Sequence, residues 1–394
     1  MTLRILQIVP SISLVYGGPS QMVRGFAAGL AAAGAEVTIA TTDSNGDVDE
    51  APLDVPLGEP RDEGGYRVIY FRCAPFRRYK FSTGLLQWLW HHAENYDIAH
   101  IHALFSPISS AAATVCRWRS LPYLLRPLGT LDPADLRKKR RLKQLYAAVL
   151  ERPNLAGAAA IHFTSQQEAD LSHRFGVTTP GVVLPLGVNP LPPLTVPQAV
   201  RDRYSIPPNR PLLLFMSRLD PKKGLDLLLP ALEQLQAEGL DFHLLLCGAN
   251  PQDRAYEQAI RQRFAESTVG DRVTATGYVA GEDKIALIQA ADLFVLPSYY
   301  ENFGIAVAEA MLAALPVVIS DQVYIWPDVQ AGEAGWVCPC TVEALAATLR
   351  SALKDPAERQ RRGQQASHVA QTRYSWAAIA QQTLELYTSL VQRA

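Results

Sequence analysis

The apolar residues in the first half of the chain alternate between two spacings. Short continuous apolar runs are typical of buried β-strands, and helical spacing is typical of helices that cover a sheet. Strands are predicted over 3–9, 36–40, 66–71, 97–102, 123–126, 159–163 and 182–184. Helices are predicted over 21–33, 85–93 and 136–150, and the capping-box sequence Ser165-Gln166-Gln167-Glu168 begins another. This alternation predicts an α/β domain whose parallel sheet is covered on both faces.

A proline-rich stretch separates this half from a second half of the same kind. Seven prolines fall within residues 190–211, and proline neither continues a helix nor fits a central strand. We therefore predict a linker over 191–210. Strands are predicted after it over 212–216, 243–247, 273–276, 293–296 and 317–320. The tail, 375–392, has helical spacing, with Trp376, Ile379, Leu384, Leu386 and Leu390 on its apolar side. The chain is thus predicted to contain two α/β domains in tandem.

Composition narrows the class of protein. The 394 residues suffice for two domains, and the shares of 48% apolar and 19% charged residues are typical of globular proteins. No apolar run approaches the roughly 20 residues that cross a bilayer. The first nine residues are interpreted as a strand rather than a signal peptide. Five cysteines are scattered, and only Cys338 and Cys340 are close, so we expect no zinc site and reduced thiols in a cytoplasmic protein.

Charge is balanced overall but uneven along the chain. The formal net charge of −1 gives no sign of nucleic-acid binding. Residues 65–152, however, contain 15 Lys and Arg against 5 Asp and Glu, and six of the seven residues in Arg137–Lys143 are basic. This run is either a solvated helix face or a surface that attracts anionic lipid headgroups or an anionic acceptor. Near a membrane, each such charge contributes on the order of 1 kcal/mol.

Ligands of open parallel sheets bind outside the carboxyl ends of the strands, so the loops there are the candidate sites. The first such loop contains Gly17-Gly18-Pro19-Ser20 and leads into a helix. Glycines let a ligand approach the backbone, and a helix N-terminus offers free N–H groups. An ordinary strand-to-helix turn has the same sequence features. The chain contains no G-x-G-x-x-G, which argues against a dehydrogenase.

Two cations follow the strand predicted over 212–216. The string Ser217-Arg-Leu-Asp-Pro-Lys-Lys-Gly224 places Arg218 and Lys223 at the end of this strand. Two fixed cations that converge on one anion stabilise negative charge where it develops, and could replace a metal ion. The alternative is that both are ordinary surface cations.

Two acids follow the strand predicted over 293–296. The string SYYENFGIAVAEAMLAALPVVISD begins at Ser298 and contains Glu301 in a loop and Glu309 in the following helix. Carboxylates accept hydrogen bonds from sugar hydroxyls. The backbone amides of Asn302–Gly304 suit hydroxyl or phosphate oxygens. An acid within an apolar helix is unusual, because an unpaired buried charge is unfavourable. The alternative is a helix cap with one surface acid.

Residues 212–320 resemble the donor-binding half of family 4 glycosyltransferases. The resemblance rests on SRLDPKKG together with the E-x7-E segment, with weaker matches at Cys247-Gly248, Gly277-Tyr278 and Gly335-Trp336-Val337. It implies the GT-B fold, in which two Rossmann-like doubly wound domains face each other across a cleft. The implied domains are 1–190 on the acceptor side, the linker 191–210, and 211–374 on the donor side. The final helix, 375–394, is expected to cross back to the first domain.

The resemblance also implies roles for individual residues. Arg218 and Lys223 would contact the donor diphosphate, Glu301 the hydroxyls of the transferred sugar, and Glu309 the ribose. The remaining donor-binding residues would be Gly17, Gly18, Gly248, Tyr278, Asn302, Phe303 and Gly304. Members of the family retain the anomeric configuration and usually need no metal, and the leaving phosphate is thought to take the acceptor proton.

The first domain carries a second string that resembles members acting on polysaccharide, lipopolysaccharide or glycolipid. It comprises His100-Ile-His102 and Arg126-Pro-Leu-Gly-Thr-Leu-Asp-Pro133. His102 would be a catalytic or acceptor-contacting residue, although both histidines could equally be satisfied strand-end residues. A metal site is disfavoured because no further ligand lies nearby. Leu128 stands where many relatives have histidine, and Arg126, Thr130 or His102 could compensate.

These features together predict a hexosyltransferase that uses a nucleotide sugar, with UDP favoured over GDP, and no cofactor. The acceptor would be lipid-linked, a glycolipid or a polysaccharide, and the enzyme cytoplasmic, with peripheral association at the inner membrane face. Leu128 motivates a second hypothesis, a non-catalytic sugar-nucleotide-binding protein. A sugar-nucleotide epimerase is a third, which the E-x7-E string disfavours.

Overall fold

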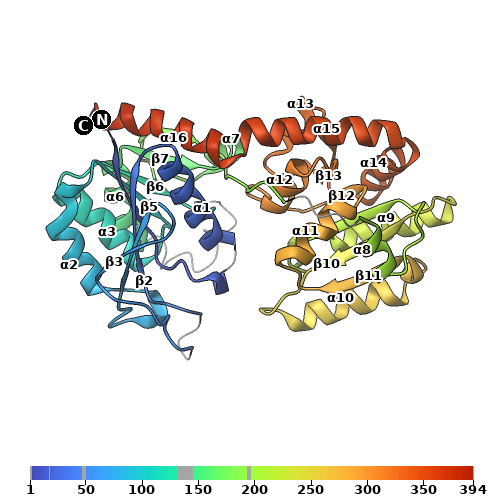
Figure 1. Cartoon of the computed structure of the whole chain (residues 1–394), viewed down its shortest axis with the longest axis horizontal. Helices are drawn as coiled ribbons and strands as arrows, with labels where there is room; N and C mark the ends of the chain where they lie inside the picture. The colour runs from blue at the N-terminus through green and yellow to red at the C-terminus, as the bar shows by residue number, and fades with distance from the viewer. Residues whose placement is uncertain (1, 17, 47–49, 132–144, 193–196, 394) are drawn as a thin grey trace. The chain divides into compact units, whose positions relative to one another are not determined.

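The computed structural model describes residues 2–16, 18–46, 50–131, 145–192 and 197–393. Its contacts divide the chain into two compact units (Figure 1). The first consists of Met1–Gly187 with Trp376–Ala394, and the second of Val188–Ser375. Each unit has its own parallel sheet with helices on it, so the predicted α/β class is confirmed.

The division between the units lies close to the proline-rich stretch but not within it. The boundary falls between Gly187 and Val188. The described part of the expected linker contains helix α8 (Pro197–Arg203), which packs on α11 (Gly281–Ala290) of the second unit. Pro197 is the first residue of this helix. The backbone N–H at that position has no acceptor within the helix, so proline loses no hydrogen bond there. Arg201 of α8 donates a hydrogen bond to Asp292 at 2.8 Å. Much of the stretch is therefore part of the second unit.

The sheet of the first unit has the strand order β3-β4-β2-β1-β5-β6-β7-β8. All its pairings are parallel except β3 with β4. Its strands are β1 Arg4–Ile8, β2 Glu36–Thr42, β3 Pro60–Asp62, β4 Arg67–Phe71, β5 Ile98–His102, β6 Tyr123–Arg126, β7 Ala160–Phe163 and β8 Gly181–Val183. Seven of the eight were predicted. The exception, β3, is a fully exposed, charged edge strand and carries no apolar pattern.

Helices cover both faces of this sheet. They are α1 Gly18–Ala32, α2 Thr83–His92, α3 Pro107–Trp118, α6 Arg152–Gly157, α7 Gln166–Leu171 and α16 Trp376–Val391. The capping box is confirmed, since the Ser165 hydroxyl accepts a hydrogen bond from the Glu168 N–H at 3.1 Å. The helix expected over 136–150 lies partly outside the described residues, and Ala147–Glu151 is a π-helical turn.

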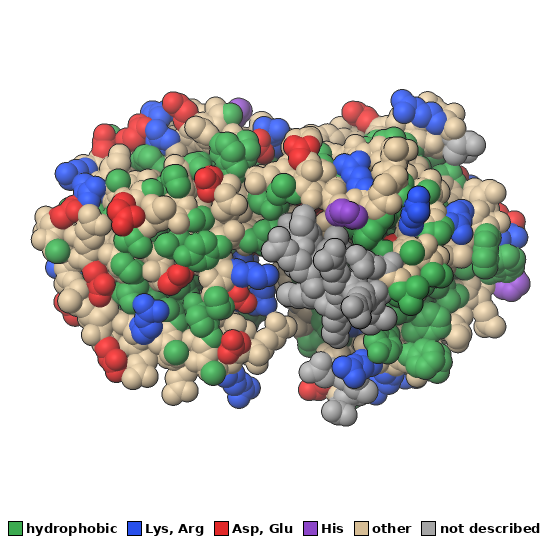
Figure 2. Space-filling view, turned by 180° about the vertical axis from the view of Figure 1, so that it is seen from behind, with side chains coloured by type: hydrophobic (Ala, Val, Ile, Leu, Met, Phe, Trp, Pro, Cys, Tyr) green, Lys and Arg blue, Asp and Glu red, His purple; other side chains and the backbone are tan. Residues whose placement is uncertain are grey.

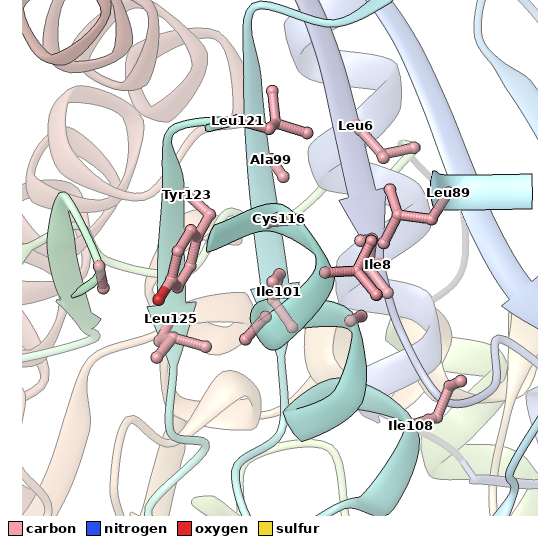
Figure 3. Packing of buried hydrophobic residues seen from close by; sticks show 14 of the residues in the cluster. Leu6, Ile8, Leu89, Ala99, Ile101, Ile108, Cys116, Leu121, Tyr123 and Leu125 are labelled. Carbon is pink, nitrogen blue, oxygen red and sulfur yellow. The ribbon is translucent and has the colours of Figure 1, made fainter. Parts of the chain in front are cut away.

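The apolar core of the first unit lies between its sheet and helices α2 and α3. Figure 3 shows Leu6, Ile8, Ile101 and Leu125 of the sheet pointing toward residues of these helices, among them Leu89. This packing buries one face of the strands, and other helices bury the opposite face. Burial on both faces explains why the strands are continuous apolar runs. Parallel strands in such sheets are buried on both sides.

Helix α16 packs beside α1 on the opposite face of the sheet (Figure 1). This places the C-terminal helix in the first unit, as the resemblance implied. The predicted apolar side is only partly correct, because the buried residues are Ile379, Ala380, Thr383, Tyr387 and Leu390. Leu384 and Leu386 are half-buried, whereas Tyr387 is fully enclosed. A tyrosine was not read as apolar, although most of its side chain is.

The sheet of the second unit has the order β11-β10-β9-β12-β13-β14, and all its pairings are parallel. Its strands are β9 Leu212–Met216, β10 His243–Cys247, β11 Val273–Gly277, β12 Leu293–Leu296, β13 Val317–Ser320 and β14 Gly335–Cys338. The strand order reverses between β9 and β12. Ligands of doubly wound sheets bind at such a switch point, so the loops after β9 and β12 are the first place to look for a site.

The remaining helices belong to the second unit. They are α8, α9 Leu225–Ala237, α10 Arg254–Glu266, α11, α12 Ile305–Leu312, α13 Trp326–Ala331, α14 Val342–Lys354 and α15 Pro356–Arg373. No helix of the described residues is both long enough and apolar enough to span a bilayer.

Candidate functional site

The loop after β9 and the loop after β12 touch through their backbones. Gly224 ends the first loop at φ +70°, and a Cβ placed on it would lie 1.9 Å from the Pro297 carbonyl oxygen. The Tyr299 N–H donates to the Lys222 carbonyl at 2.8 Å. Only glycine allows both the left-handed φ and this approach. The two loops therefore form one continuous surface at the switch point of the sheet.

Glu301 is held on both sides by backbone hydrogen bonds to the loop after β13. Its N–H donates to the Gln322 carbonyl at 3.0 Å, and its carbonyl accepts from the Tyr324 N–H at 2.9 Å. The Glu301 carboxylate forms an ion pair with the Lys223 ammonium, and the two side chains are 23% and 11% exposed. The structure thus brings together two predicted site residues that are 78 positions apart.

Arg218 lies at the same end of the sheet but points elsewhere. Its side chain is exposed, and Nη1 donates to Gln252 at 3.2 Å. No carboxylate of the described residues lies within ion-pair distance of it. Arg218 is therefore open to an anion in this conformation and does not join the Lys223–Glu301 pair.

Glu309 lies in the second turn of α12 and is 16% exposed. Its carboxylate pairs with the ammonium of Lys284, at the start of α11, at 2.5 Å. The sequence analysis did not single out Lys284. The one local signal was its place near a helix N-terminus, where the helix dipole disfavours a cation.

The segment between the two acids turns the chain into α12. Gly304 precedes this helix with φ +82°, a left-handed conformation that favours glycine. The Phe303 side chain is 3% exposed and packs edge-on against Tyr374, with ring centroids 5.2 Å apart. Only the backbone of Phe303 can therefore contact a ligand, and the predicted role of its amide remains compatible with this packing.

The predicted residues after β10 and β11 lie at the same end of the sheet. Gly248 has φ +147°, and a Cβ on it would lie 1.8 Å from the Ser217 carbonyl oxygen. Its N–H donates to the Gly277 carbonyl at 2.8 Å. Tyr278 is 79% exposed, so its ring is open to solvent. The loops after β9, β10 and β11 thus adjoin one another.

The face of the second unit that Figure 2 shows carries charges of both signs. On the left-hand side of Figure 2, acidic and basic side chains of the second unit are interspersed. Recognition of an anion here would depend on the individual cations of the loops. No group of three or more His, Cys, Asp or Glu side chains in the described residues is arranged to hold a metal ion.

In the first unit, the structure encloses His102, which was predicted to be catalytic. Its ring is 0% exposed and its Nε2 lies 2.7 Å from the Gln7 side-chain oxygen. Burial lowers the pKa of His102 well below its usual value. A side chain without accessible surface does not contact a substrate in this conformation. The structure therefore favours a buried strand histidine over the predicted role, although its Nδ1 has no hydrogen-bond partner among the described residues.

His100 belongs to the same buried group, because alternate residues of a strand share a face. Its Nδ1 lies 2.5 Å from the Tyr387 hydroxyl of α16, and its Nε2 lies 3.1 Å from Nδ1 of His162. Both His100 and His162 are almost fully buried. This polar cluster explains why β5 carries histidines on a fully covered strand.

The string that begins at Arg126 is described as far as Leu131. Arg126 is 3% exposed, and burial lowers its pKa to about 10. Leu128 has φ +57°, and the next N–H, that of Gly129, donates to the Glu168 carboxylate at 3.1 Å. The Thr130 hydroxyl donates to the Pro127 carbonyl. Arg126 and His102 are therefore too buried to take the place of the histidine that many relatives have at Leu128.

Two predicted features cannot be placed. Gly17 and the basic run Arg137–Lys143 lie outside the described residues. Gly18 is the first residue of α1 and is partly exposed.

Two family models match the chain, one in each unit. The model described as Glycosyl transferase 4-like domain matches residues 17–187. The model described as Glycosyl transferases group 1 matches residues 198–369, which include all four charged residues predicted for the donor site. The two matches together include both parallel sheets apart from β1.

Individual relatives extend this similarity over the whole chain. The chain is 27% identical over 406 residues to the D-inositol 3-phosphate glycosyltransferase of Kineococcus radiotolerans, covering 95% of this chain and 91% of that protein. It is 29% identical over 192 residues, 48% of each chain, to the alpha-D-kanosaminyltransferase of Streptomyces kanamyceticus. In this match and in two others of similar length, the chain spans about half the length of the curated relatives. Sucrose-phosphate synthase from Thermosynechococcus elongatus has a similar structure, with a TM-score of 0.76, 25% identity and 100% coverage of both chains.

Proposed function

Because the chain belongs to family 4 of the glycosyltransferases and has the GT-B fold, we propose that it transfers a hexose from a nucleoside-diphosphate sugar. The proposed reaction retains the anomeric configuration and needs no metal. UDP is the favoured nucleotide. The names of the relatives, which include glycosyltransferases and a sugar-phosphate synthase, support transfer of a glycosyl group.

The observation that carries this proposal is the Lys223–Glu301 pair at the switch point of the second sheet. In the structure the two charges neutralise each other. In the proposed complex, the donor diphosphate binds the Lys223 ammonium and the sugar hydroxyls bind the Glu301 carboxylate, so each charge exchanges its partner for the donor. As the glycosyl bond breaks, negative charge grows on the diphosphate, and Lys223 together with Arg218 stabilises it where it develops. Two fixed cations can thereby do the work of a metal ion.

The proposed acceptor is lipid-linked, a glycolipid or a polysaccharide, and binds to the first unit. The basic run Arg137–Lys143 supports a site at an anionic membrane face. Leu145 and Val149, in the helical segment that follows this run, are 64% and 63% exposed. Exposed apolar residues beside basic ones are typical of helices that lie on a membrane surface. A cytoplasmic enzyme, peripheral at the inner membrane face, would suit this arrangement.

The experiment combines donor binding with transfer. UDP-sugars and GDP-sugars are screened by calorimetry, and the donor that binds is then tested for hydrolysis and for transfer to membrane glycolipid extracts. Glu301→Ala and Lys223→Ala are each expected to lower transfer roughly a hundredfold or more. Lys222→Ala, which removes the exposed neighbouring lysine, is the matched control and retains activity. Unchanged turnover in both site variants, with their thermal melts intact, would remove the proposed donor site.

One observation favours a second candidate, a non-catalytic sugar-nucleotide-binding protein. Leu128 stands where many relatives have histidine. Neither Arg126 nor His102 has enough accessible surface to serve in its place, and the Thr130 hydroxyl donates to the Pro127 carbonyl. Tight donor binding without hydrolysis, and without transfer to any acceptor, would favour this candidate.

A further inference from the structure

The pairing of Glu309 with Lys284 is a feature that the proposed roles do not yet use. The ammonium donates to Oε1 of the carboxylate at 2.5 Å, from the first turns of α11 to the second turn of α12. The side chains of Lys284 and Glu309 are 26% and 16% exposed. The pair is therefore partly shielded from water, yet remains open to a ligand.

The second carboxylate oxygen of Glu309 is left for another partner. Within the described residues, Oε2 makes no hydrogen bond. Each oxygen of a carboxylate carries two lone pairs, so Oε1 can also accept a second hydrogen bond. A carboxylate held from one side by an ammonium can thus receive two neighbouring hydroxyl groups from the other side.

The position of Lys284 is not explained by the stability of its own helix. A cation near a helix N-terminus interacts unfavourably with the helix dipole. The preceding Glu282 and Asp283 satisfy the dipole preference of this turn, and Lys284 opposes it. Among the described residues, the ion pair that the Lys284 side chain makes is the one with Glu309.

We propose that Lys284 is a positioning residue that holds the Glu309 carboxylate in the orientation in which it binds the two ribose hydroxyls of the donor. This inference rests on the proposed function, in which Glu309 binds the ribose. An unpaired glutamate samples several rotamers and must be ordered when a ligand binds. Holding it beforehand with Lys284 removes that loss of entropy from the binding step, so the hydroxyl contacts contribute more to affinity.

Lys284 could instead act by its charge alone, through attraction to the donor diphosphate. The two roles differ in what they strengthen. A positioning residue strengthens the contribution of the ribose hydroxyls and leaves the affinity for pyrophosphate unchanged. A charge acting on the diphosphate raises the affinity for pyrophosphate and contributes equally to nucleotides with and without the hydroxyls.

The test measures the affinity of the full chain for three probes by calorimetry: UDP, 2′,3′-dideoxy-UDP and pyrophosphate. If the wild-type chain binds GDP instead, the matching GDP pair is used. In the wild type, loss of the two hydroxyls is expected to weaken binding about tenfold to a hundredfold, as for hydrogen bonds to a charged group. We call the ratio of the affinities for UDP and 2′,3′-dideoxy-UDP the hydroxyl ratio. In Lys284→Met the hydroxyl ratio is expected to fall to a few-fold, while the affinity for pyrophosphate is unchanged. Lys284→Arg keeps most of the ratio, and Lys354→Met, at an exposed lysine of α14, keeps all of it.

The outcomes separate this inference from the proposed function. If the wild type binds no nucleotide, or if Glu309→Gln leaves the hydroxyl ratio intact, the proposed role of Glu309 fails. If Glu309→Gln abolishes the ratio but Lys284→Met does not, Lys284 has no positioning role. A Lys284→Met variant that loses pyrophosphate affinity shows the charge effect instead. The double variant Lys284→Met with Glu309→Gln is expected to match Glu309→Gln alone, and thermal melts of Lys284→Met check that the fold is retained.

Discussion

At the scale of single residues, the candidate site consists of charges that are already paired. Lys223 with Glu301 and Lys284 with Glu309 each combine an ammonium with a partly buried carboxylate. Removing one member of such a pair leaves the other partly buried without its partner, which is unfavourable. The pairs therefore hold these side chains in place. In the proposed reaction a donor replaces the Lys223–Glu301 contact, whereas Lys284 continues to hold Glu309. Arg218, which is exposed and donates to Gln252 rather than to a carboxylate, is open to an anion.

The close contact of the loops at Gly224 gives a prediction at this scale. Gly224 and Gly239 both have left-handed φ values, +70° and +81°. A Cβ at Gly224 meets the Pro297 carbonyl oxygen at 1.9 Å, whereas a Cβ at Gly239 meets nothing within 4 Å. Alanine at either position strains the backbone by roughly 1 kcal/mol, and at Gly224 it also drives the two loops apart.

We therefore expect Gly224→Ala to lower the free energy of unfolding by at least about 1 kcal/mol more than Gly239→Ala. It should also weaken nucleotide binding, which Gly239→Ala leaves unchanged. Urea denaturation and calorimetry measure the two effects. Equal stability of the two variants would show that the loops are not packed as described.

The sequence predicted the loops of the site better than it predicted contacts within them. Arg218, Lys223, Glu301 and Glu309 follow strands whose apolar runs are unmistakable, so their end of the sheet could be inferred. Their partners could not be, because Lys284 belongs to a different strand-to-helix connection. The burial of His100 was equally hidden, since His100 contacts Tyr387 of α16, which is far away in sequence.

At the scale of elements, the strands missed by the sequence pattern are those with little apolar signal. β14 (Gly335–Cys338) begins with a glycine and is half-buried at its centre. Its packing explains the glycine, since a Cβ there would lie 2.0 Å from the Val317 carbonyl oxygen. β3 has no buried residue at all. The prolines of the stretch 190–211 predict a linker and not helix α8, although Pro197 stands at a helix start. Apolar periodicity thus identifies buried elements and overlooks the edges of each unit.

The packing of α1 against α16 gives a prediction at the scale of elements. Alanine usually stabilises a helix interior by about 0.5–1 kcal/mol relative to glycine. At Gly25 of α1, however, an added Cβ would lie 2.6 Å from the Trp376 ring, which packs near Phe26. Gly25→Ala is therefore expected to lower the free energy of unfolding by about 1–3 kcal/mol.

Gly84→Ala in α2 is the matched control, since its Cβ would have ordinary contacts no closer than 3.8 Å. It should be neutral or stabilising in the same thermal and urea measurements. A Gly25→Ala protein at least as stable as Gly84→Ala would contradict the described packing of α16.

At the scale of the whole molecule, the proposed membrane association depends on charge. Replacing the six basic residues of Arg137–Lys143 by glutamine should abolish sedimentation with anionic vesicles. Binding of the wild type should weaken as salt rises through the 0.1–0.5 M range, where the Debye length falls below about 10 Å. Leu145→Ser with Val149→Ser should weaken binding without changing this salt dependence. Equal pelleting of the wild type by neutral and anionic vesicles would count against an electrostatic surface.

The buried histidines predict different responses to acid for the two units. In the first unit, His100, His102 and His162 form one enclosed cluster beside Arg126. Burial lowers the pKa of His162 to about 3 and lowers those of His100 and His102 well below their usual value. In the second unit, burial lowers the pKa of His243 to about 4. These histidines are neutral in the folded protein and take up protons near pH 6.5 when the chain unfolds.

The free energy of unfolding should therefore be highest above pH 6.5 and fall as the pH drops from about 6.5 toward about 3. The reason is that, in this range, the unfolded chain binds protons that the folded chain does not. Each such histidine contributes up to about 1.4 kcal/mol per pH unit, so the first unit loses stability up to three times as steeply as the second. Urea denaturation of the full chain at pH 7, 6 and 5 measures this, in single-tryptophan variants that keep Trp336 to report on the second unit or Trp88 to report on the first. His162→Asn should flatten the slope of the first unit, whereas His368→Gln, at an exposed position of α15, should leave both slopes unchanged. Parallel slopes for the two units would mean that the cluster is already protonated or open to water in the folded protein.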